Sequence, residues 1–297
     1  MKTPVGEPQA SAPGSPSSET NAARVLVLQW ALRLMFVVPL LSWSAFAETP
    51  ENSSPVDCSK DNPALARFGE SVILYASFDG HANAEITRDD PQPTGNAAWK
   101  AAVKSRQDLF APGVFGQGLR SGKHQLVFTS SKAGLGSTGS VVLWLKPERL
   151  QHRGTYCWPV ILDALEGRYR VMFGRMGDPL NKEVLYAYLA SGSVGTSVVQ
   201  QSMSDWRPGK WHLLVVTWDR SGVEFSVDAA QPSRTSLNTP LPPGTGGLRA
   251  YLPGENEDVF VYDEFLVLDI PISHAETRRV YDEGMKMLSI QKPARAS

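Results

Sequence analysis

Residue types that perform catalysis are sparse along this chain of 297 residues. Five scattered histidines show no zinc-like spacing and no H-E-x-x-H motif: His81, His124, His152, His212 and His274. The G-x-S-x-G motif of an exposed nucleophilic serine is also absent from the sequence. We therefore expect a protein without catalysis of its own, with an enzyme that uses a non-standard site as the open alternative.

A glycine-rich segment, residues 134–139, reads literally as G-x-G-x-x-G. In a nucleotide-binding unit this motif follows a strand and opens a helix, whose N-terminus holds the pyrophosphate. Here the apolar, strand-like segment 141–145 follows the motif instead. The context predicts a loop between strands rather than a phosphate site.

The chain has two cysteines, Cys58 and Cys157. In an exported protein an even pair can form a disulfide, which we predict here between the N-terminal arm and a strand region. Closing a loop of this length stabilises the fold by about 4 to 5 kcal/mol in the chain-entropy model. Two unpaired thiols are the alternative.

Aromatic side chains are the remaining candidates for a binding surface, because flat rings contact sugar C–H groups while amides or acids fix the hydroxyls. The candidates are Trp99, Trp158, Tyr186, Tyr188, Trp206 and Tyr251. Tyr186 and Tyr188 fall on one face of a predicted strand, by the two-residue repeat of β structure. Three other tryptophans lie within predicted strands and are assigned to the core: Trp144, Trp211 and Trp218.

The segment 211–228, WHLLVVTWDRSGVEFSVD, predicts a β-hairpin. Val223, Phe225 and Val227 alternate with polar residues, which gives a strand with one dry face and one wet face. Residues 219–222, DRSG, supply the turn, since aspartate bonds its own backbone and glycine tolerates positive φ. Between residues 158 and 200 the pattern predicts three more strands, at 159–162, 169–173 and 184–189.

One helix is predicted near the C-terminus, over residues 274–283. Ser273 and Glu276 form a capping box at its start, and Gly284 stands where a helix typically ends. We expect this helix to close one end of a β-sandwich.

The hairpin resembles a "WHHVAVTWD…G…VYVDG" pattern of LamG-like jelly-roll domains, in the concanavalin A-like lectin/glucanase superfamily. Further stretches fit that family in the same order: 71–80 as the opening strand with its FDG turn, 116–120, 140–147, and 262–268 as the closing strand. The resemblance implies an all-β fold over residues 69–285, an antiparallel two-sheet jelly-roll sandwich with one short C-terminal helix.

The resemblance also implies where catalytic acids would lie. Related glucanases carry E-x-D-x-x-E or E-x-D-x-E on one strand, so that two acids flank the glycosidic bond. The nearest segment, residues 255–258, has Glu257 at the middle position and the apolar Val259 in place of a third acid. We therefore expect no hydrolysis of this kind.

A structural Ca²⁺ site is the third implication, because such jelly rolls often hold a hard cation between carboxylates and carbonyls at loop ends. The matching positions are Asp79 and Asp263. Alternation places Asp263 on the same face as Phe265 and Val267, so we expect its carboxylate to point inward, where it needs a partner. A carboxylate that only accepts hydrogen bonds is the alternative.

The N-terminus reads as a leader, disordered or helical, outside the folded domain. An apolar run at 34–41 follows two arginines and precedes Ala45-Phe46-Ala47, which predicts a signal peptide over residues 1–47 with an extended n-region. Residues 48–68 form a predicted linker or arm, and 286–297 a flexible tail. A longer apolar stretch that starts at Val25 leaves an uncleaved membrane anchor as the alternative.

Charge excludes one class of partner. The 29 basic and 30 acidic residues give a formal charge of −1 without a concentrated basic face, so no nucleic acid is expected to bind. We expect a binding module, secreted, periplasmic or at the cell surface, that recognises glycan or extracellular protein and meets a membrane only if the leader is uncleaved. The alternatives are a glycan hydrolase or lyase and a purely structural adhesion domain.

Overall fold

The computed structural model describes most of the chain after residue 61. The described residues are 62–87, 92–95, 100, 109–121, 125–130, 136–150, 157–164, 169–177, 183–191, 195–237, 247–252 and 259–291. They all belong to one unit, Val56–Ser297.

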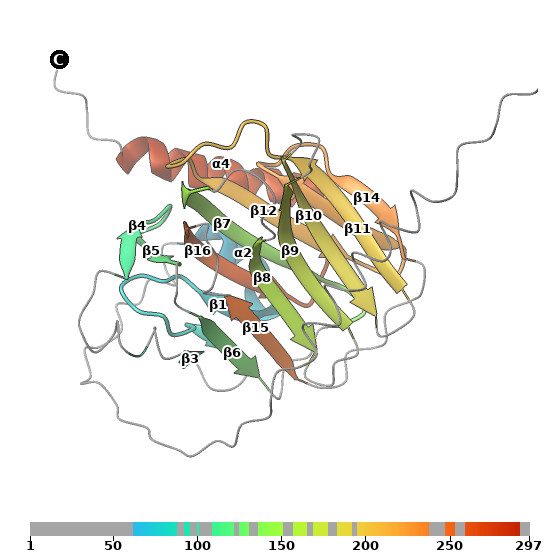
Figure 1. Cartoon of the computed structure of the whole chain (residues 1–297). Helices are drawn as coiled ribbons and strands as arrows, with labels where there is room; N and C mark the ends of the chain where they lie inside the picture. Colours follow the sequence, from blue (N-terminus) through green and yellow to red (C-terminus); the bar gives the residue numbers. More distant parts are fainter. Residues whose placement is uncertain are drawn as a thin grey trace, which may run out of the picture. The chain divides into compact units, whose positions relative to one another are not determined.

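Two antiparallel sheets form the body of this unit (Figure 1). The nine-stranded sheet runs in the order β14 (Ser233–Ser236), β13 (Gly222–Val227), β12 (His212–Trp218), β7 (Gly139–Arg149), β16 (Val259–Leu268), β1 (Val72–Ala76), β2 (Ile86–Thr87), with β5 (Gln117–Arg120) also paired to β16 and β4 (Phe110–Pro112) to β5. The seven-stranded sheet runs β11 (Gly195–Ser202), β10 (Glu183–Ser191), β9 (Tyr169–Gly177), β8 (Cys157–Ala164), β15 (Leu248–Leu252), β6 (Leu126–Ser130), β3 (Thr94–Gly95). The predicted all-β antiparallel sandwich is confirmed.

The hairpin predicted from the alternation is β12–β13. Trp218 lies opposite Val223, and the Asp219 carboxylate accepts hydrogen bonds from the backbone N–H groups of Ser221 and Gly222 at 2.7 and 3.0 Å. The bonds from Ser221 and Gly222 lower the pKa of Asp219, because they favour its ionised form. The three strands predicted between residues 158 and 200 are β8, β9 and β10, each longer than its pattern indicated.

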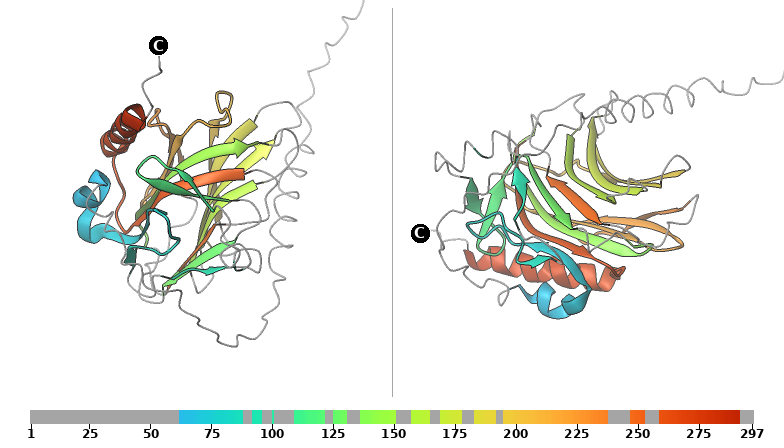
Figure 2. Two further views of the ribbon diagram at one scale, coloured as in Figure 1. Left: turned by 90° about the vertical axis from the view of Figure 1, so that its left-hand side faces the viewer. Right: turned by 90° about the horizontal axis from the view of Figure 1, so that it is seen from below.

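Apolar side chains fill two layers rather than one. Between the sheets lie residues such as Val216, Phe225 and Ala187. On the other face of the nine-stranded sheet, Trp144 and Val215 pack beneath two helices, α2 (Pro63–Phe68) and α4 (His274–Gln291), which Figure 2 shows side by side on that face. One face of this sheet is therefore covered by helices, and the other packs against the second sheet.

Helix α4 differs from its prediction in length and position. The capping box is present, with the Ser273 N–H donating to Glu276 Oε2 at 2.6 Å, but the helix continues past Gly284 to Gln291 and lies along the sheet instead of closing one end of the sandwich. A Cβ at Gly284 would lie 2.2 Å from Cζ2 of Trp144. This glycine is therefore required for close packing and does not end the helix.

None of the helices in the described part of the chain is both long and apolar enough to span a bilayer.

Candidate functional site

A β-bulge in β16 sets the orientation of two adjacent acids. Asp263 lies opposite Trp144 and Leu266 opposite Val142, so β16 has one extra residue here, and Glu264 has a φ of 55°. The extra residue breaks the alternation. Asp263 therefore points to the helix-covered face and not, as predicted, to the face that carries Phe265.

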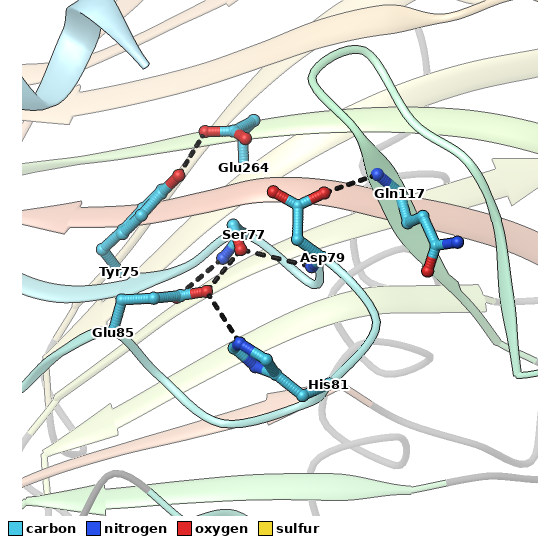
Figure 3. A network of polar contacts seen from close by, with 7 residues as sticks. All are labelled: Tyr75, Ser77, Asp79, His81, Glu85, Gln117 and Glu264. Carbon is cyan, nitrogen blue, oxygen red and sulfur yellow. Dashed lines mark hydrogen bonds and ion pairs between the residues drawn. The ribbon is translucent and has the colours of Figure 1, made fainter. Parts of the chain in front are cut away.

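Asp263 holds the turn between β4 and β5. Its carboxylate is fully buried, and Oδ2 accepts hydrogen bonds from the N–H groups of Val114 and Phe115 at 2.6 and 3.2 Å. Asp79 binds the other end of the same turn, since its Oδ1 accepts from the N–H of Gln117 at 2.5 Å (Figure 3). The two predicted acids thus converge on one turn.

Glu264, which the sequence analysis did not single out, connects this turn region to helix α2. Its Oε2 accepts a hydrogen bond from the Tyr75 hydroxyl at 2.9 Å (Figure 3). The same oxygen accepts another from Asn62 Nδ2. Asn62 also caps α2, because its Oδ1 accepts from the N–H of Ala64 at 2.7 Å. One buried carboxylate therefore joins β1, β16 and the start of α2.

A fourth acid, Glu85, closes the loop that carries Asp79. Its carboxylate accepts hydrogen bonds from the N–H of Ser77, at 2.9 Å, and from the Ser77 hydroxyl. One of its oxygens, Oε1, lies 3.7 Å from His81 Nε2 (Figure 3). The Ser77 hydroxyl in turn accepts from the N–H of Asp79 at 3.2 Å. This loop fixes where the Asp79 carboxylate lies.

Burial favours the neutral forms of these acids. It raises the pKa of Asp263, and the neighbouring charge of Glu264 raises it further. Burial also raises the pKa of Glu264, to which the charge of Asp79 adds, although the Tyr75 hydrogen bond opposes both. Glu85 follows the same rule, since burial raises its pKa and the bonds from Ser77 lower it. At high pH, Asp263, Glu264 and Glu85 are therefore ionised in surroundings that solvate their negative charges poorly.

This electrostatic arrangement predicts that mild acid stabilises the protein when metal ions are chelated. Because the pKa values of Asp263 and Glu264 are higher in the folded than in the unfolded state, the folded state binds more protons above about pH 4, and stability falls as pH rises. Each unit of pKa elevation corresponds to about 1.4 kcal/mol, or roughly 3 to 6 °C for a domain of this size. Calorimetry in chelator should give a higher melting temperature at pH 5.5 than at pH 8, and a melting temperature that rises with pH would contradict it.

Asp79 and Asp263 were predicted to share a cation. One observation suits a cation, because Asp263 Oδ1 is buried and has no hydrogen-bond partner. Against it, Asp263 Oδ2 and Asp79 Oδ1 are engaged by backbone N–H groups, and the described residues contain no group of three or more His, Cys, Asp or Glu that could hold a metal. Backbone carbonyls would have to complete such a site, and calcium binding stays a prediction.

The predicted tyrosines lie on the outer face of the seven-stranded sheet. Leu189 and Ala250 point into the core between the sheets, so by alternation their neighbours Tyr188 and Tyr251 point outward. Cross-strand pairing places both tyrosines in one row. From β11 to β3 its positions are Val198, Tyr188, Met172, Ile161, Tyr251, Val127 and Thr94.

The tyrosines of this face differ in how far they are exposed to solvent. Tyr186 and Tyr188 are buried, at 7% and 3% exposure, whereas Tyr251 is half-buried. Arg249 donates to the Tyr251 hydroxyl at 2.8 Å, and its guanidinium lies 5.8 Å from the ring centroid. Among the predicted aromatic residues whose side chains the structure describes on this face, Tyr251, held by the exposed Arg249, is the one that a ligand can reach.

Trp206 lies elsewhere. It is buried in the core between the sheets, where its ring stacks on the His212 imidazole with 4.1 Å between centroids and 3° between planes. His212 Nδ1 lies 2.7 Å from Asp228 Oδ2. Trp206 therefore has a packing role and does not extend the tyrosine face.

The remaining predicted residues fall outside what the structure describes. Trp99, Cys58, Glu255 and Glu257 are not among the described residues, and for Trp158 and Cys157 only their place in strand β8 is described. The proposed disulfide and the nearest glucanase-like acids thus stay predictions.

One tryptophan assigned to the core is in fact half-buried. Trp211 precedes the first residue of β12, and its ring centroid lies 4.8 Å from the Lys146 ammonium. The alternation of β12 did not reveal this, because Trp211 stands at the edge of the pattern rather than within it.

Comparisons with known proteins agree with this architecture. A family model described as the concanavalin A-like lectin/glucanases superfamily matches residues 120–276, more than half of the chain. No curated protein matches the sequence.

Among solved structures, the botulinum neurotoxin serotype D binding domain is 11% identical, with 71% of this chain and 51% of that chain covered and a TM-score of 0.54. The serotype D ligand-binding domain in complex with N-acetylneuraminic acid is 11% identical, with 74% and 52% covered and a TM-score of 0.56. A structure of botulinum neurotoxin type C, whose cell entry depends on interaction with two ganglioside molecules, is 10% identical, with 74% and 53% covered and a TM-score of 0.53. The chain spans about half the length of these proteins, and at such low identity the likeness concerns the fold.

Proposed function

Because the chain belongs to the concanavalin A-like lectin/glucanases superfamily, we propose that it is a non-catalytic module that binds glycan on the outer face of its seven-stranded sheet. The predicted signal peptide, residues 1–47, makes a glycan outside the cell the ligand we expect. Solved structures of the same fold include one in complex with N-acetylneuraminic acid, which supports this ligand class.

The Arg249–Tyr251 pair is the observation that carries the proposal. A half-buried ring offers a flat apolar surface for sugar C–H groups, and the guanidinium beside it donates to hydroxyl or carboxylate oxygens. Because the Arg249 guanidinium holds the Tyr251 ring in place, these side chains lose little conformational freedom when a ligand binds. Exposed Thr129 lies opposite Arg249 on the next strand and adds a hydroxyl to the same surface.

Substituting the ring tests this site. In a glycan-array screen followed by titration calorimetry, Tyr251→Ala should weaken binding at least about tenfold, or ~1.4 kcal/mol, because the stacking surface is lost. Tyr251→Phe keeps that surface and should retain most of the affinity. As a matched control, Arg234→Ala removes another exposed arginine, paired with Glu224 on the opposite sheet, and should leave binding unchanged. Equal affinities for Tyr251→Ala and the unmodified protein would exclude this face.

We also propose a structural Ca²⁺ at the turn held by Asp79 and Asp263, with the partnerless Oδ1 of Asp263 as one ligand. A bound cation would neutralise the acids and stabilise the folded state by about 2.7 kcal/mol at a hundredfold excess over Kd. At pH 7.5 the melting temperature should fall on adding chelator and recover with Ca²⁺, less with Mg²⁺. Asp263→Asn should remove that response. A melting temperature that chelator does not change would contradict the Ca²⁺ site and indicate that protons neutralise the acids instead.

A further inference from the structure

Strand register places a second set of polar and aromatic residues on the opposite sheet. Arg120 of β5 lies opposite Val261 of β16, which lies opposite Lys146 of β7. On the other side of β7, Leu145 pairs with His212, so Trp211 extends the same row next to Lys146. Lys146 stands two residues from Trp144 and therefore on the outer, helix-packed face of the nine-stranded sheet.

Trp211 is held against this face and stays half-exposed. Gly118 lies close to its ring, since a Cβ on this glycine would lie 3.4 Å from Trp211 Cη2. The Lys146 ammonium lies 4.8 Å from the ring centroid and donates a hydrogen bond to the carbonyl of Pro112 at 3.0 Å. Pro112 ends β4, at the turn that Asp263 holds, so the buried acid indirectly places this carbonyl.

Lys146 is a partly desolvated cation without an acidic partner. Among the residues that the structure describes, no carboxylate forms an ion pair with its ammonium, and one hydrogen bond leaves donor capacity for a ligand. Burial lowers the pKa of Lys146; the nearby charges of Glu148 and Asp263 oppose this shift, and that of Arg120 adds to it. An incoming anion would restore the favourable environment that the ammonium lacks.

Arg120 is fixed beside Lys146 by a two-point ion pair. Its Nε and Nη2 donate to Oε2 and Oε1 of Glu148 at 2.8 and 3.1 Å. Both side chains are about one-third exposed, at 34% and 30%. The pair sets the direction of the guanidinium and engages both carboxylate oxygens of Glu148.

We propose that this surface, the Lys146 shelf (Arg120, Lys146, Glu148 and Trp211), binds a carboxylate or sulfate group of an acidic glycan. It lies on the other sheet from Tyr251, so it is a second site and goes beyond the glycan-binding face proposed above. A sugar ring packs against the exposed part of the indole while its anionic group accepts from Lys146. Exposed Lys210, next to Trp211 in the chain, offers a further donor.

A peptide partner suits this surface less well. β7 is paired along both sides, with β12 and β16, so it has no free edge to which an extended acidic peptide can add by backbone hydrogen bonds. Recognition here must come from side chains, and the cation beside an aromatic ring suits a charged sugar.

Titration of the full chain with oligogalacturonate, its neutral methyl ester and a heparin octasaccharide tests the shelf. We expect the acid or the sulfated sugar, but not the ester, to bind, with an affinity that falls as salt rises from 50 to 300 mM. Lys146→Gln should weaken binding at least tenfold, and Lys286→Gln, on the exposed side of α4, should not. Melting temperatures of both variants establish that each is folded.

Three results would overturn the shelf: equal binding of acid and ester, an unchanged affinity in Lys146→Gln, or equally tight binding of a poly-glutamate peptide. Tyr251→Ala separates this inference from the proposed function, because it should leave unchanged that part of oligoanion binding which Lys146→Gln removes. If Tyr251→Ala abolishes binding of the acidic sugar and Lys146→Gln does not, the anion binds on the seven-stranded sheet and the shelf is wrong.

Discussion

Replacement of Asp263 by alanine is expected to lower the free energy of unfolding by about 2 to 5 kcal/mol. The substitution leaves the buried N–H groups of Val114 and Phe115 without an acceptor, and each such group costs about 1 to 3 kcal/mol. It also leaves a cavity where the fully buried carboxylate packed. Denaturant unfolding at pH 6, followed by circular dichroism, measures the loss.

Asp263→Asn is the matched control. The asparagine carbonyl oxygen keeps both hydrogen bonds and removes the charge that burial disfavours, so the loss should be much smaller than for alanine. The pH dependence of stability should flatten as well. An asparagine variant as unstable as the alanine variant would show that the charge itself, rather than the acceptor, holds the turn.

Gly284→Ala is expected to destabilise the protein by about 1 to 3 kcal/mol, although alanine is the better helix former by about 1 kcal/mol. The new methyl group would meet the Trp144 indole, which stacks on Tyr281 with 5.9 Å between ring centroids and cannot move freely. Thermal unfolding measures the change. Lys286→Ala, at an exposed position of the same helix, should be nearly neutral.

A second variant separates the clash from other causes. Trp144→Phe makes the aromatic side chain smaller. In the Trp144→Phe protein, Gly284→Ala should therefore cost less stability than it does in the unmodified protein. A stabilised Gly284→Ala protein would mean that helix propensity outweighs packing here, and that α4 does not lie as closely on the sheet as described.

Local sequence patterns correctly predicted those elements that depend on interactions between residues close together in the chain. The hairpin β12–β13 follows from alternation and the DRSG turn at residues 219–222, and the start of α4 follows from the Ser273 capping box. The end of α4 did not follow, because Gly284 is also a good helix-end signal. The residue against which Gly284 packs, Trp144, is distant in sequence and comes close only through folding.

The candidate sites show the same limit. Sequence matching located Asp79 and Asp263, but alternation gave the wrong face for Asp263, because no local signal marks the positive φ of Glu264. The two-residue repeat placed Tyr186 and Tyr188 on one face but could not show that they are buried while Tyr251 is accessible. Exposure depends on the neighbours that other strands bring together.

The most direct test of the central claim, glycan binding on the outer face of the seven-stranded sheet, is a titration of the glycan that an array screen selects. The account predicts saturable binding, with the glycan recovered unchanged and an affinity at least about tenfold lower in Tyr251→Ala. Absence of binding across the array, or binding that Tyr251→Ala leaves intact, would contradict it.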